Sequence, residues 1–204
     1  DTGKRIASLA APMMKKVHLE LGGKDPMVIA PDVDIATAVS GTAYAALINT
    51  GQVCTSTERV YVHESIMPQF SEEIADFVSK LRLGNGLDPD TDIGPMIRNK
   101  FREKVESQLS DAVASGAEIL VGGNRPSQFA KGFFLEPTVV TKVDHSMDLM
   151  LEETFGPVIP LMSYKTIDEA IKLANDCKYG LGACLMTHEP RFVKRFFEKV
   201  NAGT

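Results

Sequence analysis

Short apolar runs and longer amphipathic segments alternate along almost all of the 204-residue chain. The apolar runs have the length of strands and are bounded by turn-forming residues; they lie at 17–21, 27–30, 59–63, 119–121, 138–143, 158–162 and 183–186. The amphipathic segments carry apolar residues at helical spacing; they lie near 4–14, 34–51, 65–81, 101–116, 168–175 and 191–200. This alternation predicts an α/β fold, with a doubly wound, mostly parallel sheet and helices on both faces.

Local signals refine three of these boundaries. Asp34 and Ser65 each precede an amphipathic stripe, so both are predicted to cap the N-terminus of a helix. Pro68 then falls in the first turn of its helix, where a missing N–H is harmless. The segment 84–95 combines Gly-Asn-Gly, Asp-Pro-Asp and Gly-Pro, which predicts a surface loop.

Composition and charge narrow the classes of function. Hydrophobic residues make up 44% and charged residues 24%, as in ordinary globular domains. The net charge of −5, without a dense Lys/Arg cluster, argues against nucleic acid as a partner. No apolar run approaches the ~20 residues of a membrane helix, so no membrane partner is expected. Three cysteines favour a reducing compartment, predicted as the cytoplasm, and the four histidines show no metal-ligand spacing, so no metal is expected.

The first candidate site is the sequence Leu-Glu-Leu-Gly-Gly-Lys at 19–24. Glu20 would lie at the carboxyl end of the predicted strand 17–21, where open α/β sheets bind ligands. A partly desolvated carboxylate there is a usable general base near neutral pH. The following glycines would let the backbone approach a ligand closely. The alternative is a structural Glu20 that pairs with Lys24 or with solvent.

A second candidate is Cys54, in the sequence Asn-Thr-Gly-Gln-Val-Cys-Thr at 49–55. It follows a long helix through a glycine turn and has polar neighbours, as suits a nucleophile that must be activated by its surroundings. The alternative is a small buried hydrophobe, the common role of a free cysteine. Cys177 and Cys184 are predicted to take that structural role.

The third candidate is the sequence Glu-Glu-Thr-Phe-Gly-Pro at 152–157. Glu153 has the chemistry to hold ribose hydroxyls by charge-assisted hydrogen bonds, and Phe155 could wall a flat ring. The alternative is a solvated acidic turn with a core phenylalanine.

Together these three motifs resemble the NAD(P)-dependent aldehyde dehydrogenase superfamily. Asp-Ile-Gly-Pro at 92–95 and Tyr-Gly-Leu at 179–181 match its pattern in the same order, so the resemblance runs through essentially the whole chain. It implies Cys54 as the nucleophile and Glu20 as the base that activates water. It further implies Glu153 as a ribose ligand, Phe155 beside the nicotinamide, and the backbone of Leu21 and Gly22 close to that ring.

The implied reaction oxidises a small-molecule aldehyde to a carboxylic acid with NAD or NADP, through a thiohemiacetal and a thioester on Cys54. By the same resemblance, residues 1–20 are the tail of a coenzyme-binding domain and residues 21–204 belong to the catalytic domain. Whole family members are more than twice as long. Both ends are therefore expected to lie inside a longer chain, so a targeting signal would lie outside it. The fragment is expected to be inactive alone, and the parent enzyme to be a homo-oligomer, a dimer or a tetramer.

The sequences Glu-Arg-Val-Tyr-Val at 58–62 and Glu-Glu-Thr-Phe-Gly-Pro at 152–157 resemble lactaldehyde and semialdehyde dehydrogenases of the superfamily. Two other readings stay open. One is a CoA-acylating or phosphorylating reductase, which shares the cysteine but does not need Glu20. The other is an interaction or scaffold domain with an inactive site.

Overall fold

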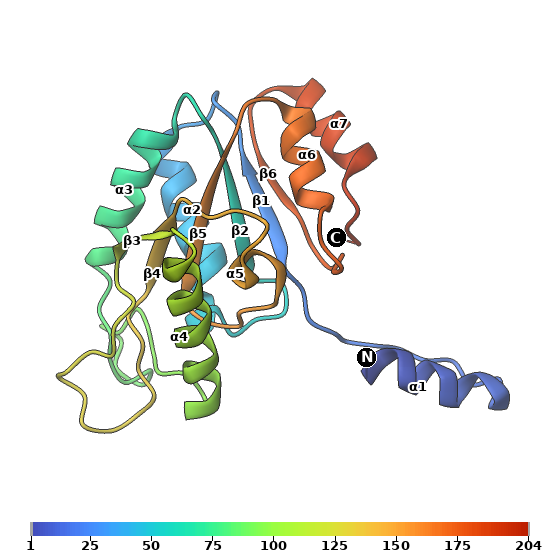
Figure 1. Cartoon of the computed structure of the whole chain (residues 1–204), viewed down its shortest axis with the longest axis horizontal. Coiled ribbons are helices and arrows are strands. Elements are labelled where there is room, and N and C mark those ends of the chain that lie inside the picture. The colour runs from blue at the N-terminus through green and yellow to red at the C-terminus, as the bar shows by residue number, and fades with distance from the viewer. Residues whose placement is uncertain (1, 204) are drawn as a thin grey trace.

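The computed structural model describes residues 2–203, and over this range it has the predicted α/β fold (Figure 1). Six strands form one sheet in the order β3-β4-β5-β2-β1-β6. Their bounds are β1 (Asp25–Ile29), β2 (Thr57–His63), β3 (Glu118–Val121), β4 (Thr138–Thr141), β5 (Val158–Tyr164) and β6 (Cys184–Met186). The edge pair β3 and β4 is antiparallel, and every other neighbouring pair is parallel, as predicted for a mostly parallel sheet.

Helices connect the strands and cover the sheet. They are α1 (Thr2–Ala10), α2 (Ile35–Leu47), α3 (Met67–Ser79), α4 (Asn99–Ala114), α5 (Asp148–Leu151), α6 (Ile167–Asn175) and α7 (Pro190–Lys199). Two 3-10 helices, η1 (Ala11–Met13) and η2 (Ile48–Gly51), follow α1 and α2. Over residues 2–203, no helix has the length and apolar character that crossing a membrane requires.

The sheet separates two hydrophobic cores. Side chains alternate across a strand, so Met27 and Ile29 of β1 pack in the core under α2 and α3, while Val28 faces the other core. That second core contains residues from α4, α5, α6 and α7. Helices therefore cover both faces, which confirms the doubly wound arrangement (Figure 1).

The two capping predictions had different outcomes. Asp34 caps α2, because its carboxylate accepts a hydrogen bond of 2.8 Å from the backbone N–H of Thr37. The prediction for Ser65 was wrong: Ile66 is the N-cap residue of α3 and makes no side-chain cap. The Ser65 hydroxyl instead lies 2.8 Å from Nδ1 of His63 at the end of β2. Pro68 lies in the first turn of α3, as predicted, and leaves one donor fewer for a cap to satisfy.

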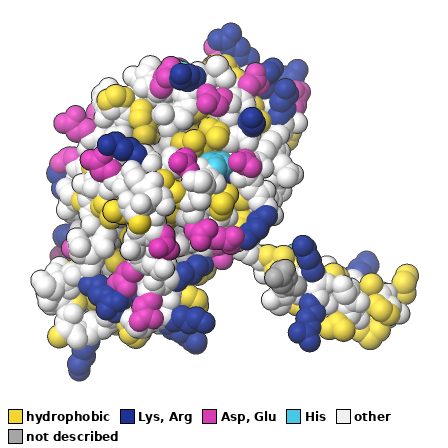
Figure 2. Space-filling view, viewed as in Figure 1, with side chains coloured by type: hydrophobic (Ala, Val, Ile, Leu, Met, Phe, Trp, Pro, Cys, Tyr) yellow, Lys and Arg dark blue, Asp and Glu magenta, His cyan; other side chains and the backbone are white. Residues whose placement is uncertain are grey.

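The predicted strand at 17–21 was also wrong. Residues 2–22, here called the N-terminal arm, extend away from the sheet, and the first strand begins only at Asp25 (Figure 1). A strand needs a neighbour to hydrogen-bond with, and the sheet formed within residues 2–203 offers none here. Val17, Leu19 and Leu21 are therefore 44%, 36% and 50% exposed. Apolar side chains are visible along the arm in Figure 2.

Candidate active site

The Gly22–Gly23 segment, which leads from the N-terminal arm into β1, brings all three sequence motifs together. The backbone N–H of Gly23 donates to Oε1 of Glu153 at 3.2 Å. A β-carbon on Gly22 would overlap the same carboxylate, and one on Gly23 would lie 2.8 Å from the backbone oxygen of Cys54. The two glycines are therefore required by close approach, and they bring the Cys54 loop and Glu153 to one place.

The loop that carries Cys54 has an unusual backbone. Asn49, Thr50 and Gly51 all have left-handed φ values, of 50°, 62° and 69°. A β-carbon on Gly51 would overlap the backbone oxygen of Gly156, so the loop packs tightly on the turn after Phe155. Such strain persists only where the surroundings hold it, which is typical of functional loops. Cys54 itself is exposed at the end of this loop.

The Asp-Ile-Gly-Pro segment at 92–95 anchors the cysteine loop from the other side. The hydroxyl of Thr50 donates to the backbone oxygen of Gly94 at 3.1 Å. Oε1 of Gln52 accepts from the backbone N–H of Ile97 at 2.9 Å. These bonds explain why this segment, which carries no obvious chemistry, belongs to the same site as the nucleophile candidate.

Glu58 organises the turn that holds Glu153 and Phe155, and the sequence analysis did not identify it. Its Oε2 accepts from the backbone N–H of Thr154 at 2.7 Å, and its Oε1 from the backbone N–H of Phe155 at 2.8 Å. Lys24 completes the group: its Nζ lies 2.8 Å from Oε2 of Glu58 and 2.8 Å from the hydroxyl of Thr154. Lys24 and Glu58 are only 1% and 4% exposed, so this is a buried ion pair.

Burial changes the acid–base properties of the site. It lowers the pKa of Lys24 below its ordinary value, against the opposing effect of the Glu58 carboxylate. Burial, followed by the charge of Glu58, raises the pKa of Glu153. Burial also raises the pKa of Asp25 to about 6, against a backbone hydrogen bond from Gly182. The carboxylates near Gly22 and Gly23 are therefore held in a poorly solvated environment.

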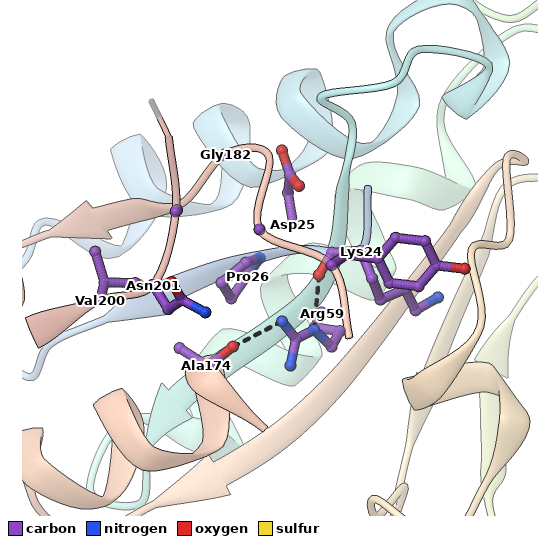
Figure 3. Close-up of a pocket in the computed structure, with 11 residues that line it drawn as sticks. Lys24, Asp25, Pro26, Arg59, Ala174, Gly182, Val200 and Asn201 are labelled. Carbon is purple, nitrogen blue, oxygen red and sulfur yellow. Dashed lines mark hydrogen bonds between the residues drawn. The ribbon is translucent and has the colours of Figure 1, made fainter. Parts of the chain in front are cut away.

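A buried arginine supports the same region from below (Figure 3). Nε of Arg59 donates to the backbone oxygen of Lys24 at 2.8 Å, and its terminal nitrogens donate to the carbonyls of Leu173 and Ala174. Those carbonyls lie at the C-terminal end of α6, where the helix dipole favours a cation. Two adjacent charged residues, Glu58 and Arg59, at the start of an otherwise apolar strand were the sequence signal for this arrangement.

Glu20 is not where the sequence analysis expected it. Its side chain is 78% exposed on the N-terminal arm, and it lies 2.7 Å from Nε2 of His18. It is neither at the end of a strand nor desolvated, because the segment 17–21 has no sheet to join. Within residues 2–203, no hydrogen bond or ion pair joins Glu20 to Cys54 or to Lys24. Leu21, the predicted coenzyme neighbour beside it, is half-exposed.

The other cysteines differ from the prediction that they are buried. Cys177 is partly buried and accepts a hydrogen bond of 3.4 Å from the backbone N–H of Tyr179. Cys184 is exposed as a residue because β6 is an edge strand. Burial of the thiol, and then the charge of Asp25, raise the pKa of Cys184. A raised pKa makes a thiol less reactive at neutral pH.

The arrangement places an exposed thiol near a half-buried carboxylate and a partly exposed aromatic ring. Glu153 is half-buried, and its carboxylate accepts a hydrogen bond from the N–H of Gly23. The carboxylate can accept further hydrogen bonds from hydroxyl groups. Phe155 is partly exposed and has a left-handed φ of 56°, which the bond from its N–H to Glu58 helps to hold. A carboxylate next to a partly exposed aromatic ring suits a ligand that joins a sugar to a flat ring. These residues therefore fit the nicotinamide–ribose half of NAD or NADP.

Comparisons with known proteins agree with this geometry. A sequence model described as the aldehyde dehydrogenase family matches residues 1–204. Aminoaldehyde dehydrogenase 1, peroxisomal, of Pisum sativum is 38% identical over 202 residues, covering 99% of this chain and 40% of that protein. The 3,6-anhydro-alpha-L-galactose dehydrogenase of a Vibrio species (strain EJY3) is 36% identical over 203 residues, covering 98% of this chain and 42% of that protein.

Solved structures give the same result. The crystal structure of betaine aldehyde dehydrogenase from Staphylococcus aureus in complex with NAD+ superposes with a TM-score of 0.95 and 41% identity. It covers 100% of this chain and 41% of the S. aureus chain. The chain thus spans about 40% of the length of the relatives it matches.

Proposed function

Because this chain belongs to the aldehyde dehydrogenase family, we propose that it is the catalytic part of an enzyme that oxidises an aldehyde to a carboxylic acid. The coenzyme would be NAD or NADP, and the reaction would pass through covalent intermediates on Cys54. The relatives named above are dehydrogenases, and one of them is solved as a complex with NAD+. Residues 21–204 would belong to the catalytic domain and residues 1–20 would be the tail of a coenzyme-binding domain.

One observation carries the proposal. The Gly22–Gly23 segment contacts both the Cys54 loop and the Glu153 carboxylate, although the three lie far apart in the sequence. If each motif had only a structural role, nothing would require the three to lie together. A reaction that needs a nucleophile beside a coenzyme does require it.

In the proposed reaction, the Cys54 thiolate attacks the aldehyde carbon, and the carbonyl oxygen becomes the oxyanion of a thiohemiacetal. The backbone N–H of Cys54 would stabilise this oxyanion, since it donates to no protein group within residues 2–203. Loss of a hydride then leaves a thioester on Cys54. Glu20 would take a proton from a water molecule, and the resulting hydroxide attacks the thioester, which releases the carboxylic acid and regenerates the Cys54 thiolate.

Glu153 and Phe155 are the proposed coenzyme ligands, with the backbone of Leu21 and Gly22 close to the nicotinamide. NAD or NADP bound there would supply the acceptor for the hydride. Glu153 would hold the ribose hydroxyls and Phe155 would limit the position of the ring. The contact between Gly22 and Glu153 supports this group of residues as one binding surface.

The role of Glu20 includes a rearrangement. In this structure the residue lies on the N-terminal arm and pairs with His18, so the arm has to pack against the body before the carboxylate can reach Cys54. The exposed apolar side chains of the arm favour such packing, since they are otherwise left in water. Because the chain spans only about 40% of the length of its relatives, we propose that the chain alone has little or no dehydrogenase activity. Formation of NADH at a high rate by the isolated chain would contradict this.

We further propose a substrate class, an assembly and a compartment for the whole enzyme. The substrate is proposed to be a lactaldehyde or a semialdehyde, in line with the sequence at 58–62, and the whole enzyme to be a homodimer or homotetramer in the cytoplasm. The relatives include proteins named as peroxisomal or chloroplastic, so a fusion of the whole enzyme to a fluorescent protein is the test of its compartment.

A protection assay tests the proposed chemistry on the chain as it exists. The rate at which iodoacetamide modifies Cys54 is measured by peptide mass spectrometry, with and without a small aldehyde. Thiohemiacetal formation should slow the modification of Cys54 and leave Cys177 and Cys184 unchanged. A Cys54→Ser variant controls for reaction of the aldehyde with lysines. If the aldehyde protects no cysteine, or all three equally, the chain is better described as a scaffold domain.

A further inference from the structure

The buried pair of Lys24 and Glu58 is hydrogen-bonded to the turn that carries the proposed coenzyme ligands. Lys24 belongs to the segment that enters β1, and Glu58 lies in β2, four residues after Cys54. We propose that this pair is a positioning device: it fixes the turn of Glu153, Thr154 and Phe155 against the cysteine loop and so sets the affinity for the nicotinamide half of the coenzyme. The effect on coenzyme affinity rests on the proposed function, whereas the positioning of the turn does not.

Both carboxylate oxygens of Glu58 accept hydrogen bonds. Oε1 accepts from the N–H of Phe155, and Oε2 accepts from the N–H of Thr154 and from Lys24. A glutamine of the same shape has one carbonyl oxygen and presents an NH2 group at the other position. It can therefore satisfy only one of the two backbone N–H groups. The carboxylate is required by the geometry, and Lys24 supplies the counter-charge that a buried carboxylate needs.

The turn needs this support because of its own backbone. Phe155 has a left-handed φ of 56°, a conformation that a phenylalanine adopts only when its surroundings hold it. Thr154 is buried and receives the hydrogen bond from Lys24. Glu153, one residue earlier, is thereby placed with its carboxylate against Gly22 and Gly23. Release of Thr154 and Phe155 would free Glu153 as well.

A second ion pair at the same turn is a weaker support. Lys178 pairs with Glu152, but their side chains are 60% and 46% exposed. Exposed pairs contribute little because water and salt screen them. Lys24 and Glu58, with side chains 0% and 5% exposed, are not screened in this way. The buried pair therefore determines the position of the turn.

Amide hydrogen exchange, measured residue by residue, tests the positioning. In Glu58→Gln, exchange at Thr154, Phe155 and Gly23 is expected to accelerate at least about tenfold, while amides of β2 and β5 stay protected. The double variant Lys24→Met with Glu58→Gln buries no unpaired charge, so it should fold and still show the acceleration. Glu118→Gln, which breaks the exposed pair with Lys142, is the matched control and should change none of these amides. Unchanged exchange at Thr154 and Phe155 in the double variant would overturn the positioning role.

Binding of NAD+ tests the second half of the proposal. NAD+ is titrated into the unaltered chain, the double variant and Glu118→Gln, and shifts of the Thr154 and Phe155 amide signals are followed by NMR. The double variant is expected to bind at least about fivefold more weakly than the other two. If NAD+ shifts neither signal in the unaltered chain, the coenzyme assignment of the turn fails, even where hydrogen exchange supports the positioning. If all three proteins bind equally, the pair does not set affinity.

Discussion

Gly22 lies directly against the carboxylate of Glu153, so closely that any β-carbon at position 22 would overlap Oε1 of that carboxylate. Gly22 does not have a left-handed φ, so its backbone conformation does not require glycine. The position requires glycine because there is no room for a side chain. The glycine pair thus contacts both the Glu153 carboxylate and the backbone of Cys54.

Gly22→Ala should displace the Glu153 carboxylate and weaken coenzyme binding about tenfold, or about 1.4 kcal/mol. The hydrogen bond from Gly23 to Glu153 should weaken as well, which faster exchange of the Gly23 amide would report. Gly86→Ala is the matched control, since a β-carbon there would meet no atom within 4 Å. Equal NAD+ affinity and equal Gly23 exchange in both variants would argue against Glu153 as a coenzyme ligand.

Lys24→Met should lower the free energy of unfolding by about 3–5 kcal/mol, because it leaves the Glu58 carboxylate buried and unpaired. Removing both charges should cost less than the sum of the two single losses, which denaturant unfolding of the single and double variants measures as a coupling energy. Additive losses would mean that the two residues do not stabilise each other.

Asp25→Asn should stabilise the fold at pH 7.5 by up to about 3 kcal/mol, at 1.36 kcal/mol per pKa unit. Burial raises the pKa of Asp25 from 3.8 to about 6. Between about pH 4 and pH 6, the folded state therefore keeps a proton on Asp25 that the unfolded state has lost. The contribution of Asp25 to stability therefore falls as pH rises from about 4 to 6, and stays lower above 6. Urea unfolding across pH 4–8 should show this slope in the unaltered chain and a smaller one in Asp25→Asn. A variant that is less stable at pH 7.5 would contradict the account.

Gly51→Ala should destabilise the cysteine loop by more than about 2 kcal/mol, since it combines a left-handed φ of 69° with overlap of the Gly156 backbone. The rate of Cys54 alkylation should change with it, because the loop that positions the thiol is displaced. Gly94→Ala is the control: it lies in the segment that anchors the same loop, and its β-carbon would meet no atom within 4 Å. Thermal unfolding and Cys54 alkylation that are the same in both variants would show that the tight contact with Gly156 is unimportant.

The strands β1, β2, β4 and β5 were predicted well because they are largely buried and therefore read as apolar runs. Runs such as 59–63 and 158–162 correspond to β2 and β5 at the centre of the sheet. The segment 17–21 has the same apolar character but no neighbouring strand, so its pattern alone was misleading. Composition of a segment does not reveal whether a hydrogen-bonding partner exists.

The candidate site was predicted in part. The sequence identified both the glycine motif at 19–24 and the acidic motif at 152–157 as candidate sites. It did not show that Gly22 contacts Glu153, because that contact forms only in the folded chain. Glu58 was missed, because a carboxylate that binds backbone N–H groups far along the chain leaves no periodic signal. Ser65 failed as a cap for a different reason: its hydroxyl hydrogen-bonds with His63, only two residues earlier.

The central claim is that Cys54 is the nucleophile of this site, and the rate of its reaction with iodoacetamide relative to Cys177 and Cys184 tests it most directly. Peptide mass spectrometry gives the three rates in one sample, from pH 6 to 9. Cys54 is expected to react fastest at every pH, with Cys184 slowed by the burial that raises its pKa. Equal, slow rates at all three cysteines would contradict it.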